Sequence, residues 1–451
     1  MNAKANSIGD NTREKARELQ EKLYLAAKKS ATRRFHALYD KIYRMDILEQ
    51  GWDQVKENKG SPGVDEESIE DFIRTGELEN LGEIQAALMN KKYRPRKVKR
   101  IYIPKPDGRQ RPLGIPTIRD RIVQASTKYV MEPIFEVDFL DCSYGFRPNR
   151  SANQALEEIR RAMNNYYEVV LDADIKGFFD NIDHEQMLSF VQQRISDRRV
   201  LKLIRKWLKC GVMDSGVVYE SELGTPQGGV ISPLLANIYL HEFDKFWTTQ
   251  DEVRGKLVRY ADDFVILFRT MEDAERGLQL VRNKLEELGL ELNEEKTDII
   301  DTRKGKKGFD FLGFHVRQVY SKPRWGYYAQ MWPSARSMNR IRAKIKEFMG
   351  KPSTPLRSLE DVIRTLNPIL RGWMNYYRFG NSSKHFNLID RYVQERLGNW
   401  WRKKINTRGA KWRHYFPPER LKACGVQILT GNVIYWKHYR KLKEEGHRRA
   451  V

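Results

Sequence analysis

The chain has 451 residues and a formal charge of +22, with 82 Lys and Arg against 60 Asp and Glu. This length gives room for about three ordinary domains, and the 40% of hydrophobic residues, with 19 Phe, 21 Tyr and 10 Trp, exclude a disordered chain. The positive charge favours a polyanionic partner, nucleic acid before membrane.

The number of cysteines and the length of the apolar runs indicate the cellular compartment in which the protein works. Cys142, Cys210 and Cys424 are too few and too scattered for a disulfide framework or a CxxC zinc module, so we expect a reducing compartment. The longest apolar run, Phe264 to Phe268, falls far short of the roughly 18 residues of a membrane span, and the N-terminus has no apolar signal segment. We therefore expect a soluble, intracellular protein.

The N-terminal region mixes Lys and Arg with scattered Leu and Tyr over residues 1–55, which predicts basic amphipathic helices in an N-terminal extension. Turn formers from Asn58 to Val64 mark a boundary before a helical stretch through Met89. No low-complexity linker or simple internal repeat interrupts the chain.

A basic hairpin is predicted next. Strand-like segments at 100–104 and 109–115 are joined through Asp107-Gly108, a strong turn signal. The hairpin would bring Lys105, Arg109 and Arg111 close together, a cluster that suits a triphosphate because Lys offers a point charge and Arg a fork of donors. On these residues alone, a merely solvated hairpin is the favoured interpretation.

An acidic strand end follows at residues 169–174. A period of two places Asp172 and Asp174 on one face, roughly 6.5 Å apart along the strand. Asp183 and Gln186 then have the spacing of a helix N-cap and its N3 residue. Asp174 is expected where a strand passes into a loop and helix, although acids at strand ends also serve simply as turn formers.

Asp262 and Asp263 lie between two apolar, strand-like segments. Two adjacent carboxylates at the tip of an apolar hairpin repel each other unless a cation neutralises them. Mg²⁺ takes one or two protein carboxylates and completes its octahedron with water and substrate phosphate. A magnesium site is therefore one interpretation, and an ordinary Asp-Asp turn is the other.

The segment between these acids holds Gly224-Thr-Pro-Gln-Gly-Gly-Val230, where Gln227 would face the site, and a helix for which Ser232 is the predicted N-cap. A glycine-rich turn is weak evidence alone. Apolar residues stepping by 3 and 4 from Ala274 to Leu288 predict another helix. Together these elements give β-α-β-β-α-β order over residues 168–300, the pattern of a ferredoxin-like sheet.

The C-terminal third interleaves cations with flat rings. Residues 401–451 contain fourteen Lys and Arg and three acids, which is half of the net charge, and seven of the ten Trp lie at or after Trp325. Phosphates and unstacked bases bind such groups. For any one residue, a solvated basic face with Trp in a helical core is the alternative.

Seven motifs follow one another along the chain: Ile103-Pro-Lys-Pro-Asp-Gly108, Arg111-Pro-Leu-Gly-Ile-Pro116, Tyr144-Gly-Phe-Arg-Pro148, Asp174-Ile-Lys-Gly-Phe-Phe-Asp-Asn-Ile182, Thr225-Pro-Gln-Gly-Gly229, Tyr260-Ala-Asp-Asp263 and Phe311-Leu-Gly-Phe314. In this order and spacing they closely resemble the reverse transcriptases encoded by bacterial group II introns, over about residues 50–400. A further segment, Arg371-Gly-Trp-Met-Asn-Tyr-Tyr377, resembles the maturase or X segment of that family.

The resemblance implies an α/β (α+β) protein: a right-hand polymerase with fingers and a ferredoxin-like palm, followed by a helical thumb. We expect five parts from it. These are a basic helical N-terminal extension (1–55), fingers with the basic hairpin (56–167), a catalytic palm (168–320), a thumb or maturase X domain (321–405) and a basic C-terminal segment (406–451).

The resemblance also implies an RNA-directed DNA polymerase working by two-metal nucleotidyl transfer. Asp174, Asp262 and Asp263 would hold two Mg²⁺, with Mn²⁺ as a substitute, and Asp172 would have a supporting role. The dNTP contacts implied are Lys105 and Arg111 on the triphosphate, Phe179 as the gate against a ribose 2′-hydroxyl, Gln227 against the nucleotide, and Lys296 as a proton donor to pyrophosphate.

The implied partners are group II intron RNA, an RNA template with a DNA primer, dNTPs and target DNA, in splicing and in mobility by target-primed reverse transcription. The chain stops at Val451 with only Cys424 in its tail, so we expect an endonuclease-lacking form. An RNA-binding splicing factor with secondary polymerase activity and a host-domesticated enzyme of repair or defence are the alternatives. Expected nucleic-acid contacts are Arg147, Arg371, Trp373, Tyr376, Tyr377, Arg402, Lys403 and Lys404.

Overall fold

The protein is represented by a computed structural model that describes residues 2–104, 108, 110–214, 217–219, 228–350, 358–406 and 415–435. The predicted site residues Lys105 and Gln227 lie outside the described residues. The chain divides into two compact units, and the five-part domain organisation stays a prediction. Unit 1 comprises residues 1–151, 173–266 and 275–298, and unit 2 comprises residues 152–172, 267–274 and 299–451.

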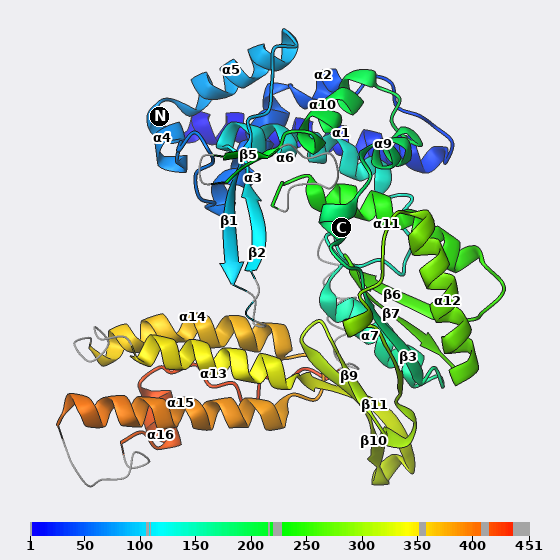
Figure 1. The fold of residues 1–451 in the computed structure, drawn as a ribbon. Helices are drawn as coiled ribbons and strands as arrows, with labels where there is room; N and C mark the ends of the chain where they lie inside the picture. The colour runs from blue at the N-terminus through cyan, green and yellow to red at the C-terminus, as the bar shows by residue number, and fades with distance from the viewer. Residues whose placement is uncertain are drawn as a thin grey trace. The chain divides into compact units, whose positions relative to one another are not determined.

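Unit 1 begins with helices, as the basic amphipathic pattern predicted (Figure 1). Helix α1 buries Ala16, Leu19, Leu23 and Ala27, which recur every three or four residues and so form one face. The turn formers after Asn58 end the third helix, where Lys59 takes a left-handed conformation with φ 47°. The five helices are α1 (Asn2–Lys29), α2 (Tyr39–Ile42), α3 (Met45–Asn58), α4 (Ile69–Arg74) and α5 (Glu77–Met89).

The predicted basic hairpin is confirmed as antiparallel strands β1 (Val98–Pro104) and β2 (Gln110–Ile115), with Ile103 opposite Arg111. Strands β4 (Val212–Asp214) and β5 (Val217–Tyr219) extend it into a sheet of order β2-β1-β4-β5. Directly after β2, the largely buried helix α6 (Ile118–Phe135) begins.

A second sheet carries the two acidic motifs, and its strand order is β6-β7-β3-β8. In chain order its first strand lies between the third and fourth, so the predicted ferredoxin-like arrangement and the α/β fold class are confirmed. The strands are β3 (Val169–Asp174), β6 (Lys256–Tyr260), β7 (Asp263–Phe268) and β8 (Asp298–Asp301). The helices along the same stretch are α8 (Phe178–Asn181), α9 (His184–Gln192), α10 (Arg198–Leu208), α11 (Ser232–Thr249) and α12 (Met271–Glu287).

Two predicted helix starts have different outcomes. The Asp183 carboxylate accepts the backbone N–H of Gln186, as the spacing predicted. The prediction for Ser232 is wrong by one residue, because α11 begins at Ser232 and Ile231 is the N-cap, without a side-chain cap. Pro233 fits this register because the backbone N–H groups of a first helical turn have no intrahelical partner.

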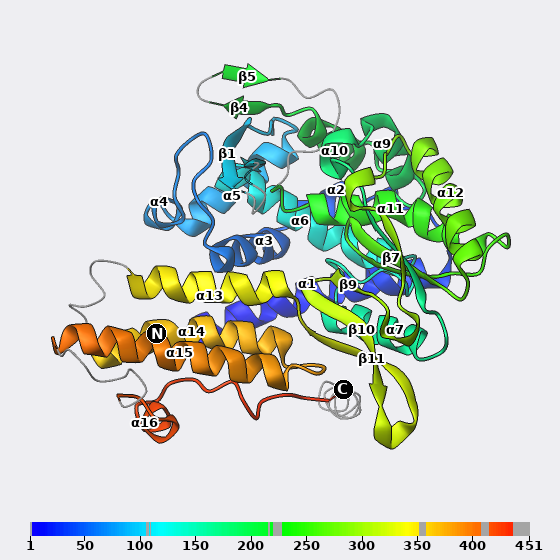
Figure 2. The same ribbon diagram turned by 60° about the horizontal axis from the view of Figure 1, so that its bottom comes forward.

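Unit 2 contains a three-stranded sheet and a helical C-terminal region (Figures 1 and 2). Helices α13, α14 and α15 lie side by side in both views, and each buries an apolar stripe. None of the helices in the described ranges has the length and apolarity needed to cross a membrane. The elements are α7 (Ala152–Met163), β9 (Gly308–Phe311), β10 (Phe314–Ser321), β11 (Gly326–Pro333), α13 (Ala335–Gly350), α14 (Leu359–Tyr377), α15 (Ser383–Lys404) and α16 (Pro418–Ala423).

Candidate active site

Strand β3 ends at Asp174. Val169, Val170, Leu171 and Ala173 are buried, whereas Asp172 and Asp174 are only half-buried. The backbone N–H of Asn293 donates to the Asp174 carbonyl at 2.8 Å and so secures the strand end. Asp174 is therefore held on a fixed backbone with its carboxylate on the less buried face.

The turn between β6 and β7 carries the other two acids. Ala261 takes a left-handed conformation with φ 59°, which is strained for a residue with a side chain. Gly145 packs against this turn so closely that a Cβ there would lie 2.4 Å from the Ala261 nitrogen. Only glycine fits at position 145 without displacing the turn that presents Asp262 and Asp263.

A buried cation supports the same turn. Arg259 is fully buried, and its Nε donates to Asp244 Oδ1 at 2.7 Å. Its Nη1 donates to the Ala261 carbonyl at 2.9 Å and to Asn237 Oδ1 at 3.1 Å. Nη2 donates to the Ser143 hydroxyl at 2.8 Å, and Asn237 in turn donates to the Gly145 carbonyl at 2.8 Å.

This Arg259 cluster connects the Asp262-Asp263 turn to helix α11 and to the chain around Gly145. Sequence reasoning missed it, although one signal was present: Arg259 directly follows the apolar pair Leu257-Val258 within strand β6. A charge that is fully buried must be paired and hydrogen-bonded, so it marks a fixed structural position.

The three predicted catalytic acids lie together. Strands β3 and β7 are neighbours in the sheet, so Asp174 and the Asp262-Asp263 turn come from adjacent strands. Burial and the negative charges of Asp262 and Asp174 raise the pKa of Asp263 to about 6. Burial, with the charge of Asp174, also raises the pKa of Asp262. Part of the Asp263 side chain faces solvent. The rest is surrounded by protein atoms and by the two other carboxylates, which raise its pKa.

Lys296 supplies the counter-charge. The 3₁₀ helix η1 (Glu294–Lys296) brings its Nζ to 2.6 Å from Asp174 Oδ2. Asn293 donates to the same oxygen at 3.2 Å. Both residues follow α12 in the chain, and sequence reasoning identified only Lys296.

The carboxylates of Asp174, Asp262 and Asp263 are of the ligand type that suits a hard divalent cation. Carboxylate oxygens are the protein ligands that Mg²⁺ prefers, and the raised pKa values record a repulsion that a cation would relieve. No group of three or more His, Cys, Asp or Glu among the described residues is arranged as a metal site. Asp174, Asp262 and Asp263 therefore interact electrostatically without being arranged as a formed metal site, and Lys296 pairs with one oxygen of Asp174.

Besides Lys296, two of the predicted nucleotide-binding residues are described, Arg111 and Phe179. Arg111 is exposed on β2, and its charge lowers the pKa of Asp262 against the larger effect of burial, so it lies within electrostatic reach of the acids. Phe179 is half-buried in α8, edge-on to Phe178 at 5.1 Å. At the described end of the glycine-rich turn, a Cβ on Gly228 would lie 2.5 Å from the Gly114 carbonyl, so this glycine admits a protein backbone.

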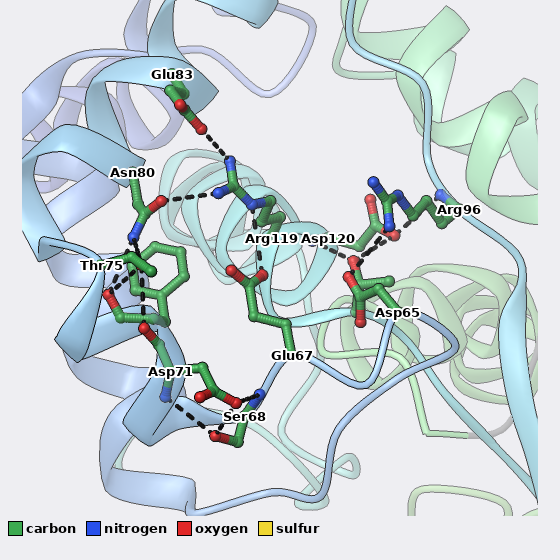
Figure 3. A network of polar contacts seen from close by, with 12 residues as sticks. Asp65, Glu67, Ser68, Asp71, Thr75, Asn80, Glu83, Arg96, Arg119 and Asp120 are labelled. Carbon is green, nitrogen blue, oxygen red and sulfur yellow. Dashed lines mark hydrogen bonds and ion pairs between the residues drawn. The ribbon is translucent and has the colours of Figure 1, made fainter.

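A polar network anchors the base of the strand that carries Arg111 (Figure 3). In the first turn of α6, Arg119 donates to Glu83 at 2.7 Å and to Asn80 at 2.8 Å. The next residue, Asp120, accepts the backbone N–H of Arg96 at 3.0 Å, two residues before β1 begins. The chain that enters β1 and the helix that follows β2 are thereby fixed to each other and to α5.

The predicted nucleic-acid contacts differ in exposure. The Arg147 side chain is 3% exposed, pairs with Glu136 at 2.8 Å and donates to the carbonyls of Leu140 and Ser143. This placement favours a structural role, and its contact with nucleic acid stays a prediction.

The other predicted contacts lie in unit 2. Tyr377 is buried and donates to the Ser337 hydroxyl at 2.7 Å, whereas Tyr376 is 38% exposed and donates to the Leu312 carbonyl. Trp373 is half-buried against Tyr377. Four cations are exposed or half-buried: Arg371, Arg402, Lys403 and Lys404.

Two family models match the chain. One is described as reverse transcriptase (RNA-dependent DNA polymerase) and matches residues 103–316. The other is described as group II intron, maturase-specific domain, and matches residues 338–416.

Named relatives support the same assignment. Protein YkfC of Escherichia coli is 34% identical over 347 residues, which cover 68% of this chain and 90% of that protein. The group II intron-encoded protein LtrA of Lactococcus lactis is 31% identical over 63% of this chain and 57% of its own length. The putative COX1/OXI3 intron 1 protein of Saccharomyces cerevisiae is 26% identical over 89% of this chain and 50% of its own. The chain therefore spans little more than half the length of the two intron-encoded relatives.

Proposed function

Because this chain belongs to the reverse transcriptases and maturases of group II introns, we propose that it copies RNA into DNA by two-metal nucleotidyl transfer and binds intron RNA to promote splicing. In intron mobility it would extend a primer in target DNA. We propose that these activities take place in the cytoplasm, in association with the nucleoid when the protein acts on DNA. The observation that carries the proposal is the convergence of three carboxylates from adjacent strands, with the pKa of Asp263 raised to about 6 by burial and by its two neighbours.

Each carboxylate has a defined part in this proposal. Asp174, Asp262 and Asp263 would hold two Mg²⁺, which when bound favour ionisation of the primer 3′-hydroxyl and neutralise the leaving pyrophosphate. The Lys296 ammonium pairs with the Asp174 carboxylate at 2.6 Å. Released from Asp174, its ammonium would donate a proton to an oxygen of the leaving pyrophosphate.

The nucleotide would be held by residues around this cluster. Arg111 and Lys105 would bind the triphosphate, because a fork of donors and a point charge together suit its oxygens. Gln227 would contact the incoming nucleotide. Phe179, five residues after Asp174, would exclude a ribose 2′-hydroxyl with the edge of its ring.

Primer extension tests the polymerase. We expect wild-type protein to extend a DNA primer on an RNA template with dNTPs and Mg²⁺, and Asp262→Ala to lose at least about 10³-fold in rate, because the developing charge loses its main electrostatic support. Asp298→Ala, an exposed acid at the start of β8, is the matched control and should retain activity. A wild-type protein that binds primer-template but incorporates no nucleotide would contradict the proposal.

The maturase role is favoured by the match over residues 338–416. Splicing of the intron RNA requires binding rather than polymer synthesis by this protein. We therefore expect Asp262→Ala to promote splicing as the wild type does while its DNA synthesis is lost. Equal loss of both activities in a folded variant would refute separate roles.

A further inference from the structure

The hairpin of β10 and β11 lies outside both family matches for most of its length, since the first match ends at residue 316 and the second begins at 338. Its strands pair from Phe314 opposite Pro333 to Ser321 opposite Gly326, joined by the 3₁₀ helix η3 (Lys322–Arg324). In both views its tip points away from helices α13 to α15 of the same unit (Figures 1 and 2).

Trp325, at this tip, combines two unfavourable features. Its side chain is 86% exposed, so a large apolar ring stands in water. Its φ is 49°, a left-handed conformation that glycine or asparagine adopts with less strain than a bulky residue. Neither cost is needed to close the turn, because Asn at the same position would avoid both. Such a strained and exposed residue points to a role in contacting something outside the chain.

Two further rings lie beside it. Tyr320 and Tyr327 are opposite each other across the hairpin, so they share a face. They meet edge to face at 5.3 Å and are 47% and 45% exposed. The tip therefore carries three exposed aromatic side chains that can stack on flat, apolar partners.

A basic loop packs against the same hairpin. The 3₁₀ helix η2 (Arg303–Gly305) is held there because Arg317 donates to the Gly305 carbonyl at 2.6 Å and the Lys304 backbone N–H donates to Gln318 at 3.1 Å. A Cβ on Gly305 would lie 3.7 Å from the Tyr327 ring. The loop cations are therefore close to the aromatic face.

The charge of this region is strongly one-sided. Residues 303–327 contain seven Lys and Arg and one acid, Asp310. Asp310 pairs with His315 at 2.7 Å, and Arg303 and Lys306 pair with Asp301. The side chains of Lys304, Lys307 and Lys322 are exposed. Rings that can stack, next to exposed cations, are the combination that binds unpaired bases and their phosphates.

We propose that this hairpin tip is an RNA-binding site, distinct from the carboxylate cluster. An unpaired base stacks on Trp325, and Lys304, Lys307 and Lys322 contact the flanking phosphates. The proposal rests on the proposed function, in that RNA is the ligand of a maturase. RNA is favoured over a membrane or an acidic protein because the rigid rings and the cations together match both parts of a nucleotide.

The test uses the full-length chain and a labelled RNA stem with an unpaired loop, measured by fluorescence anisotropy. Base stacking on an aromatic ring contributes enough that Trp325→Asn should bind about 5- to 100-fold more weakly. The same variant should melt at an equal or higher temperature, since Asn relieves the strained backbone. The double variant Lys304→Ala with Lys307→Ala should lower the slope of log affinity against log salt by roughly 1.4, about 0.7 for each phosphate contact to a single strand.

Tyr166 provides a matched control. It is also exposed, at 73%, and also left-handed, with φ 66°. The chain around Tyr166 lacks an excess of cations, since residues 157–168 contain three acids and two Arg. Tyr166→Asn should therefore bind the RNA as the wild type does.

RNA affinity of Trp325→Asn within twofold of the wild type would overturn the proposal. If Trp325→Asn also lost binding to anionic vesicles, the tip would be assigned to a membrane surface instead. Extension of a short annealed primer-template, run in parallel, separates this outcome from failure of the proposed function. Normal primer extension by Trp325→Asn would show that the polymerase is intact. The RNA affinity from anisotropy would then report on the hairpin tip alone.

Discussion

Lys296 and Asp174 are 122 residues apart in the sequence, and the Lys296 Nζ lies 2.6 Å from Asp174 Oδ2. The ammonium pairs with a carboxylate oxygen that the proposed mechanism assigns to a divalent cation. In that mechanism Lys296 and the metal would compete for one oxygen of Asp174. The proposed proton donor would therefore also influence how much Mg²⁺ the site requires.

Lys296→Met should change both properties in opposite directions. Without the competing ammonium, half-maximal activity should need less Mg²⁺, because the Asp174 oxygen is no longer paired at 2.6 Å with a cationic side chain. The maximal rate should fall about 10²-fold, which is typical for the loss of a general acid. Magnesium titrations of primer extension measure both.

The control for this experiment is Lys176→Met. Lys176 pairs with Glu291 at 3.3 Å, so it is a lysine of the same region in an exposed ion pair. Its loss should leave both the Mg²⁺ requirement and the rate unchanged. A Lys296→Met enzyme with the wild-type maximal rate would remove the proton-donor assignment.

Asp263→Asn should stabilise the metal-free protein while abolishing polymerisation. The pKa of Asp263 is raised from 3.8 to about 6 by burial and by Asp262 and Asp174. The folded state therefore binds this proton more tightly than the unfolded state, so stability falls as pH rises from about 4 to about 6. Asn removes the repulsion, but the site is exposed and screened, so the gain at pH 8 is about 1 kcal/mol or less.

Thermal melts in EDTA at pH 4 and pH 8 measure this effect. The melting temperature of the variant should exceed that of the wild type at pH 8, and the difference should shrink at pH 4. Added Mg²⁺ should stabilise the wild type more than the variant, because only the wild type offers the full carboxylate cluster. A variant less stable than the wild type at pH 8 would show that Asp263 supports the fold instead.

Arg259→Ala should unfold much of the protein, because it leaves the Asp244 carboxylate buried without a partner. The cost of breaking such a pair is about 3–5 kcal/mol. The double variant Arg259→Met with Asp244→Leu replaces the pair by apolar groups and should recover most of that stability. Its polymerase activity should stay at least tenfold low, since the Ala261 carbonyl has still lost the donor that holds the catalytic turn. Full activity in the double variant would show that the Arg259 cluster only stabilises the fold.

These residues show which features local patterns predict. The β3 and β7 strands, the Asp183 cap and helix α12 each follow from residues within a few positions, because alternation, capping and 3.6-residue periodicity are local. The Arg259 cluster joins residues 15 to 116 positions apart, and no local pattern pairs them. The predicted start of α11 differs from the observed start by one residue. Pro233 is accommodated at either the first or the second position of a helix, so it does not decide whether Ile231 or Ser232 is the N-cap.

The motif around Arg147 shows a second limit. Whether an arginine faces nucleic acid or the protein interior depends on which carbonyls and carboxylates the fold places around it. Glu136 and the Leu140 carbonyl lie close in sequence but surround Arg147 only through a specific loop path.

Arg147→Ala and Arg371→Ala should therefore have opposite effects. The first removes a buried guanidinium that bonds Glu136 and several carbonyls, so the free energy of unfolding should fall by about 3 kcal/mol or more. The second removes an exposed cation and should leave stability within about 0.5 kcal/mol while weakening RNA binding. Denaturant melts and RNA titrations at low temperature, where both variants are folded, separate the two. Strongly weakened RNA binding by folded Arg147→Ala would restore its predicted contact with nucleic acid.

Phe179→Ala should relax the choice of sugar. Phe179 is half-buried in α8 directly after the Asp174 strand, so its ring is partly free to meet a nucleotide. A smaller side chain would leave room for a ribose 2′-hydroxyl, and incorporation of rNTPs should rise at least tenfold relative to dNTPs. Phe178→Leu alters the buried ring that meets Phe179 at 5.1 Å, so it serves as the control. It should lower stability while keeping the preference for dNTPs. Competing dNTP and rNTP incorporation measures both variants, and unchanged discrimination in Phe179→Ala would reassign that ring to packing.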